Sequence, residues 1–107
     1  MNDDKLRGVL GFAMRAGKCL SGDFACERAL RGGKVCALLL DAAASANTKD
    51  KYVSLCEREK VPCILLEDMG GAIGKEGRMV AAVTDSGFAR MLTEADANRN
   101  TNFFGGK

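Results

Sequence analysis

The 107-residue chain is long enough for one domain, and its apolar residues, 47% of the total, suffice for a buried core. The formal net charge is only +2, but residues 5–34 carry seven Lys or Arg against two acidic residues, a local net charge of +5. No apolar run approaches the roughly 20 residues that cross a bilayer, and the N-terminus lacks a signal-peptide hydrophobic stretch. These features exclude a membrane-spanning helix and predict a cytoplasmic protein with a polyanionic partner.

The first third of the chain predicts a helix, a short strand and a second helix. Apolar residues spaced three and four apart over residues 3–16 indicate an amphipathic helix that a glycine ends. Residues 18–21 follow as a short strand, and Gly22 interrupts the chain. Residues 23–32 then predict the second helix, which a pair of glycines ends.

The rest of the chain alternates between short apolar runs and amphipathic segments. Apolar runs of this length between turns are typical of strands covered on both faces. Ser45 and Asp85 are good N-cap residues for two of the helices. Strands are expected at 35–40, 62–66 and 79–84, and helices at 46–59, 68–74 and 86–95. This alternation predicts an α/β fold, a three-layer α/β/α sandwich with a central mixed four-stranded sheet.

The C-terminal end differs in composition from the rest. Residues 1–95 are expected to form the domain, and residues 96–107 a C-terminal tail that is polar until Phe103-Phe104. The tail is too short for a further element, so we expect it to be disordered or lightly docked by its two rings. A partner-binding motif is the alternative.

The cysteines and the lack of histidine argue against metal and covalent chemistry. The five cysteines have the wrong spacing for a four-cysteine zinc site, and we expect them to be buried and reduced. Cys19 and Cys26 flank a helix start with cations nearby and are the only candidates for a reactive thiol. With no histidine to act beside Ser or Cys, we expect no catalytic residue, no metal and no cofactor.

A glycine-rich segment at 70–75 resembles a phosphate-binding loop only in part. The NTPase loop needs a glycine where Met69 stands, and a Ser or Thr after the lysine where Glu76 stands. The sequence therefore excludes an NTPase of that type.

The helix start after Gly22 is the best candidate for a binding site. Unpaired N–H groups and the helix dipole favour an anion there, so phosphates could rest on the N–H groups of residues 23–25. A compact site of this kind suits structured RNA, whose bends bring phosphates together. A helix with solvated charges is the alternative. The cations around this helix start are Lys18, Arg28, Arg31 and Lys34.

Several segments in order along residues 3–95 match one family. They include LGFAMRAGKCLSG at 10–22, ERALRGGK at 27–34, GGAIGKEGR at 70–78 and AAVTDSGFARML at 81–92. The chain resembles the kink-turn RNA-binding ribosomal protein superfamily of archaeal ribosomal protein seven-Ae and eukaryotic ribosomal protein L-thirty-e. It is most similar to the small bacterial YlxQ-type branch.

The resemblance implies an α/β/α sandwich that binds kinked RNA through the helix start after the glycine and a loop before the last strand. The implied partner is structured RNA, either rRNA or a kink-turn RNA in a ribosomal or translation-linked setting, bound by a monomer without catalysis. Together with the basic segment, the predicted RNA-binding residues are Lys18, Gly22, Asp23, Phe24, Arg28, Arg31, Lys34, Gly74, Lys75 and Arg78.

The chain departs from the family at the helix start. The best-studied members present Asn-Glu there to read bases, whereas this chain has Phe24-Ala25. Ala25 cannot accept a hydrogen bond from a base edge, and Phe24 offers stacking or packing instead. The phosphate-positioning half of the site is retained and the base-reading half is changed. The alternative is a protein-interaction module that keeps the fold but has lost specific RNA recognition.

Overall fold

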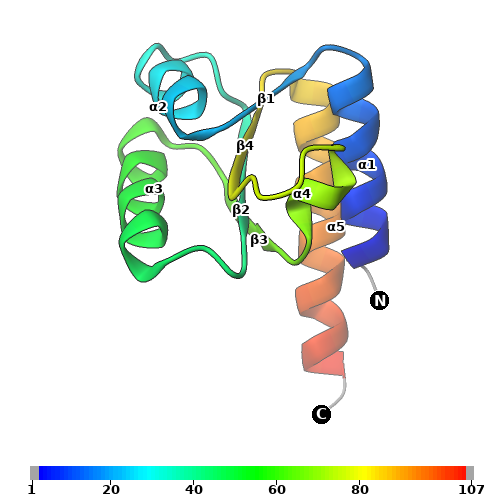
Figure 1. Cartoon of the computed structure of the whole chain (residues 1–107). Coiled ribbons are helices and arrows are strands. Elements are labelled where there is room, and N and C mark those ends of the chain that lie inside the picture. The colour runs from blue at the N-terminus through cyan, green and yellow to red at the C-terminus, as the bar shows by residue number, and fades with distance from the viewer. Residues whose placement is uncertain (1–2, 106–107) are drawn as a thin grey trace.

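The computed structural model of the chain describes residues 3–105 and has nine helices and strands in that range. Figure 1 labels them. Their bounds are α1 Asp3–Arg15, β1 Cys19–Ser21, α2 Asp23–Arg31, β2 Ala37–Asp41, α3 Ala46–Glu59, β3 Cys63–Leu66, α4 Met69–Ala72, β4 Val80–Val83 and α5 Ser86–Gly105. Each helix and strand expected from the sequence is present, and all bounds but one lie within two residues of the prediction.

The four strands form one mixed sheet in the order β1-β4-β2-β3. β4 pairs antiparallel with β1 on one side and with β2 on the other, whereas β3 pairs parallel with β2 at the edge. In this register Val83 lies opposite both Cys19 and Ala37. The predicted mixed four-stranded sheet is confirmed.

Helices cover both faces of the sheet. Figure 1 shows α1 and α5 on one side and α2 and α3 on the other. Strand side chains alternate between the two layers, so that Leu39 and Ala81 pack with α1, α4 and α5. Leu38 and Ala82 pack with α2 and α3 in a second core. The strands are therefore buried on both faces, as their continuous apolar runs predict, and the three-layer sandwich is confirmed.

α3 shows how local sequence sets an element's bounds. The Ser45 hydroxyl accepts a hydrogen bond from the Thr48 N–H at 3.2 Å, which caps the helix start as predicted. The helix ends at Lys60, which adopts the left-handed conformation with φ of 60°. The buried face of α3 carries Tyr52, Leu55 and Cys56 against the sheet.

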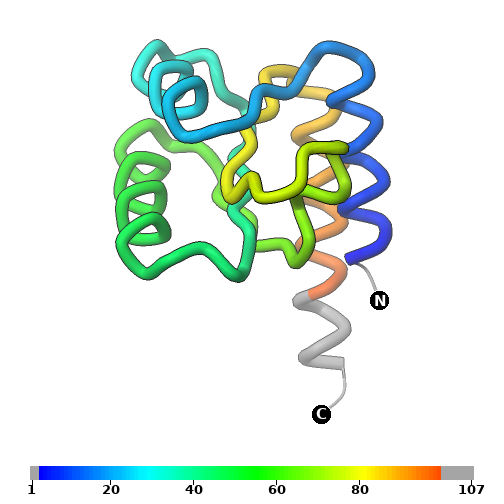
Figure 2. Tube along the Cα trace, viewed as in Figure 1, coloured from blue at the N-terminus to red at the C-terminus, as the bar shows by residue number. Residues whose placement is uncertain are grey.

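The predicted end of the last helix at residue 95 is wrong, because α5 continues to Gly105 (Figure 1). Polar composition does not end a helix, and the segment contains no glycine or proline before Gly105. Arg99 also ties this stretch to the domain through Asp3 at 2.7 Å and the Leu65 carbonyl at 2.8 Å, and it pairs within the helix with Asp96 at 2.6 Å. In Figure 2 the first turns of α5 run alongside α1. The side chains of Phe103 and Phe104 are outside the part of the chain for which the structure describes side chains, so their expected docking stays a prediction.

Among residues 3–105, none of the helices is both long enough and apolar enough to cross a membrane.

Candidate nucleic-acid interface

α2 begins directly after β1, at a glycine with a conformation that other residues rarely adopt. Gly22 has φ of 98° and ψ of 151°, in a region used almost only by glycine. Its N–H donates to the Val80 carbonyl at 3.1 Å, which fixes the turn against β4. No side chain caps the helix here, and the N–H groups of residues 23–25 have no acceptor within the described part of the chain. The N–H groups at this helix start are therefore available to an anion.

The loop before β4 reaches the same point. The Arg78 guanidinium donates through Nη1 to the Ser21 hydroxyl at 2.8 Å. The same Nη1 atom lies 2.9 Å from where a Cβ on Gly22 would stand. Gly74 and Gly77 turn the loop with φ of 74° and 89°. The structure thus brings together the helix start and the loop that the sequence paired, although Ser21 was not among the predicted site residues.

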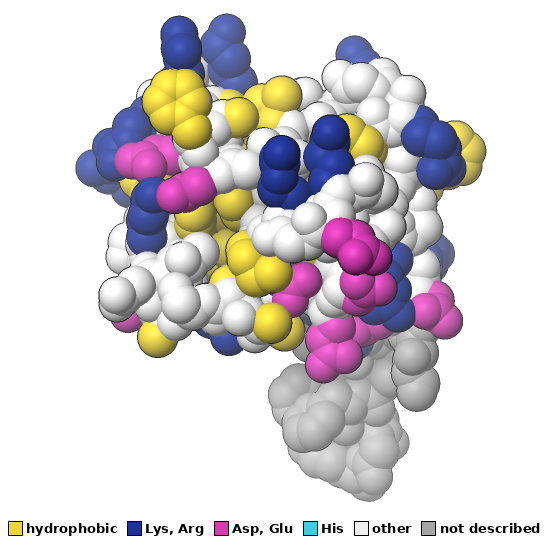
Figure 3. Space-filling view, viewed as in Figure 1, with side chains coloured by type: hydrophobic (Ala, Val, Ile, Leu, Met, Phe, Trp, Pro, Cys, Tyr) yellow, Lys and Arg dark blue, Asp and Glu magenta, His cyan; other side chains and the backbone are white. Residues whose placement is uncertain are grey.

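The predicted cations remain at the surface. Figure 3 shows Lys and Arg side chains gathered over α2 around exposed hydrophobic side chains. Arg31 pairs with Glu27 at 2.9 Å, and Glu27 also pairs with Lys51 at 2.8 Å. Arg28 and Lys34 have no acidic partner within 4.0 Å among residues 3–99. Exposed cations from the predicted set are Lys18, Arg28, Arg31, Lys34, Lys75 and Arg78.

Asp23 faces α3 rather than the open helix start. The Tyr52 hydroxyl donates to the Asp23 carboxylate and, at 2.9 Å, to its main-chain carbonyl. The Lys51 ammonium lies 3.0 Å from the same carboxylate. These bonds, first from Tyr52 and then from Lys51, hold the pKa of Asp23 below its ordinary value. Asp23 therefore anchors α2 on α3, a contact across 29 residues that the sequence pattern does not reveal.

The lowered pKa of Asp23 makes part of the stability pH-dependent. A carboxylate with a depressed folded-state pKa contributes stability above its unfolded pKa of about 3.9, and loses it as pH falls through the folded value. We expect Asp23→Asn to be less stable than the wild type at pH 7, with the difference shrinking at an acidic pH below the unfolded pKa of about 3.9, as the carboxylate becomes protonated. Chemical denaturation at both pH values measures this, with Asp50→Asn as the exposed control. An equal difference at both values would contradict it.

Burial argues against reactivity of the two candidate thiols. Cys19 and Cys26 are 7% and 0% exposed. Burial raises the pKa of Cys19 to about 11 and, as the main cause, that of Cys26 to about 12. Because the thiolate is the nucleophile, neither residue is activated at neutral pH. The prediction of buried cysteines holds for Cys19, Cys26 and Cys56, whereas Cys36 and Cys63 are partly exposed.

Asp41 is a structural residue that sequence reasoning missed. It is 6% exposed at the end of β2, where Oδ1 accepts from the Ala43 N–H at 2.8 Å. Oδ2 accepts from the Met69 N–H at 3.0 Å. One carboxylate thus ties the turn after β2 to the start of α4, which leads into the Arg78 loop. In the sequence, the only indication of this role is that Asp41 is a single acidic residue directly after a continuous apolar run.

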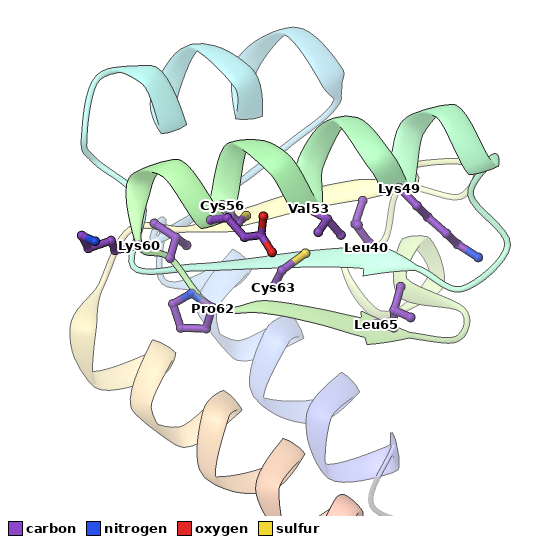
Figure 4. Close-up of a pocket in the computed structure, with 10 residues that line it drawn as sticks. Leu40, Lys49, Val53, Cys56, Lys60, Pro62, Cys63 and Leu65 are labelled. Atoms are coloured by element: carbon purple, nitrogen blue, oxygen red, sulfur yellow. The ribbon is translucent and has the colours of Figure 1, made fainter.

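A pocket of about 640 Å³ lies between α3 and the edge strand β3, away from the start of α2 (Figure 4). Its wall is mainly apolar, with Lys49 and Lys60 toward its two ends. None of the predicted RNA-binding residues lines it. The lining residues are Leu40, Lys49, Val53, Cys56, Glu57, Lys60, Val61, Pro62, Cys63 and Leu65.

Comparison with solved structures places the fold. A Bacillus halodurans protein of unknown function superposes with a TM-score of 0.82 at 32% identity, covering 87% of this chain and 97% of that one. The Giardia lamblia 15.5kD RNA binding protein superposes with a TM-score of 0.74, covering 91% and 86%. At 14% identity this second likeness shows a shared fold.

Comparison of sequences gives the family. No family model matches the chain. The RNA-binding protein YlxQ of Bacillus subtilis is 41% identical over 87 residues, which cover 78% of this chain and 87% of that protein. The RNA-binding protein YlxQ of Enterococcus faecium is 33% identical over 96 residues, which cover 87% and 92%. The chain therefore belongs to the YlxQ family, which confirms the resemblance indicated by its sequence motifs.

Proposed function

We propose that this protein binds structured RNA, as a cytoplasmic monomer that acts by binding and not by catalysis. Two relatives at 41% and 33% identity are named RNA-binding proteins, which supports the RNA partner. The finer proposal is a kink-turn-like RNA in a ribosomal or translation-associated setting. It is supported by the family's motifs and by the shape of the cationic surface.

The meeting of two distant segments at the start of α2 carries the proposal. Arg78 and Ser21, 57 residues apart in sequence, are joined by a hydrogen bond beside the uncapped helix start. A phosphate on the N–H groups of residues 23–25 would lie next to this fixed guanidinium. Arg28 lies one turn along the same helix and would reach an adjacent phosphate.

A sharply bent RNA suits this arrangement better than a straight duplex. A bend brings phosphates of two strands close together, and the cations come from two segments, α2 and the loop at 74–79. Lys75 is exposed in the loop, and Lys18 is exposed just before β1. Ala25 offers no side-chain polar group to a base edge, so discrimination would rest on RNA shape and on phosphate spacing.

Titration of a kink-turn RNA and a plain duplex at two salt concentrations tests the proposal. We expect both complexes to weaken with salt, because phosphate contacts release counterions, and we expect tighter binding to the kink-turn. Equal weak binding to both would reject kink-turn recognition. No binding to either would reject an RNA partner of these classes and favour the protein-interaction module, whose partner would be retained after ribonuclease treatment.

Arg28→Ala is expected to weaken binding to every RNA tested by about tenfold, because it removes a charged hydrogen-bond donor to phosphate. The slope of log affinity against log salt should fall by about one. Arg90→Ala is the matched control, since it removes one exposed positive charge from α5, on the opposite face of the sheet. Loss from Arg90→Ala equal to that from Arg28→Ala would indicate a general charge effect and reject the site.

A further inference from the structure

A shallow groove of about 710 Å³ lies on the outer surface of α2, next to β1. Its apolar lining includes Leu20 and Phe24, which are 40% and 78% exposed. Its rim is cationic, and Figure 3 shows this combination of hydrophobic and basic side chains over α2. The rim cations are Arg28, Arg31 and Lys34.

The Phe24 ring has no role in the core. α2 packs on the sheet through Cys26, Ala29 and Leu30, which are all at least 93% buried. The ring instead projects from the first turn of the helix toward solvent. Phe24 shares an apolar groove with Leu20 beside cations that lack acidic partners, and this combination, unlike a ring exposed singly, is a candidate binding surface.

The charges around the groove restrict its occupant. The acid nearest in sequence to the rim, Glu27, is paired with Arg31 and Lys51, and Asp23 is bonded to α3. Arg28 and Lys34 therefore present positive charge that no acid within residues 3–99 offsets at 4.0 Å. The occupant needs a flat apolar face joined to negative charge. A nucleobase on its phosphate backbone has both properties.

The groove is continuous with the proposed phosphate site, because Arg28 belongs to both. We infer that the Phe24–Leu20 groove binds one unpaired RNA base by stacking, while Arg28 and Lys34 hold its flanking phosphates. This inference rests on the proposed function. It specifies the RNA ligand further, as a bent stem with an unpaired nucleotide beside the bend. Because every base has a face that can stack on Phe24, recognition of that nucleotide is tolerant of base identity.

Two RNAs that differ only at the unpaired nucleotide test this. One carries an ordinary base in the bulge of a kink-turn stem, and the other carries an abasic residue there. We expect wild-type protein to bind the first about tenfold more tightly, since stacking of one base on an aromatic ring is of that order. Phe24→Ala should remove this tenfold preference, and Phe24→Trp should restore it. Arg28→Ala should weaken binding to both RNAs equally.

Phe12→Ala is the matched control, because Phe12 is also an exposed ring, 62% accessible, beside Arg15 at 5.1 Å. It should keep the full preference for the RNA with the base. A preference that survives Phe24→Ala, or that is absent from the wild type while RNA binding persists, overturns the stacking site alone. Failure of wild-type protein to bind either RNA overturns the proposed function and the stacking site together.

Discussion

Gly22→Ala is expected to lower both the free energy of unfolding and the affinity for RNA. The conformation at Gly22 lies in a region essentially restricted to glycine, so an alanine there is strained by about 1–3 kcal/mol. Its Cβ would stand 2.9 Å from Arg78 Nη1, so the guanidinium would have to shift from its position beside Ser21. Urea denaturation and RNA titration measure the two effects, and we expect affinity to fall by at least tenfold as the Arg78 contact is lost.

Gly17→Ala separates strain from displacement. Gly17 also has positive φ, 74°, but nothing lies within 4 Å of an added Cβ. We expect this variant to lose about 1 kcal/mol of stability and to keep its affinity for RNA. If Gly17→Ala and Gly22→Ala lose the same affinity, displacement of Arg78 is not the cause.

The layers of the fold could be predicted because local pattern and burial agree along most of the chain. Strands such as Ala37–Asp41 are apolar without interruption and are covered on both faces. The Ser45 cap locates the start of α3 to the residue. The end of α5 could not be predicted from composition, because a polar stretch continues as helix when neighbouring elements contact it. Arg99 makes those contacts with Asp3 and the Leu65 carbonyl.

The sequence predicted those parts of the candidate site that depend on local backbone conformation. It did not predict the side-chain contacts between residues far apart in the chain. Gly22 and the glycines of the 74–79 loop mark positions of positive φ, which sequence indicates directly. The bond from Tyr52 to Asp23 and the bond from Arg78 to Ser21 depend on strand order, which no local pattern specifies. Asp23 was therefore predicted at the RNA-binding surface, although its carboxylate is bonded to α3.

These distant contacts give the site its rigidity. Tyr52 is fully buried and fixes the start of α2 on α3, and Arg78 is fixed by Ser21. A phosphate arriving at the helix start would meet groups already in place, so little ordering would be needed on binding. We therefore expect stability and RNA affinity to be linked in this protein, and the buried Asp41 is the residue chosen to test this link.

Asp41→Ala is expected to cost about 3 kcal/mol of unfolding free energy, because it leaves the Met69 N–H and the Ala43 N–H without an acceptor. For a chain of this size the melting temperature would fall by roughly 10 °C. Asp41→Asn should lose much of the same stability. The two N–H groups bond to different oxygens, and asparagine would turn an NH₂ group toward one of them.

Asp85→Ala is the control for an ordinary helix cap. Its carboxylate accepts a single bond, from the Phe88 N–H at 2.9 Å, so its loss should cost about 1 kcal/mol. Thermal denaturation of the three variants gives the order directly, with Asp41→Ala the least stable. The Asp41 variants should also bind RNA more weakly than Asp85→Ala, because α4 positions the loop that carries Arg78. Wild-type stability in Asp41→Asn would show that one oxygen suffices, and the second carboxylate oxygen would then not be needed to connect β2 to α4 and the loop at 74–79.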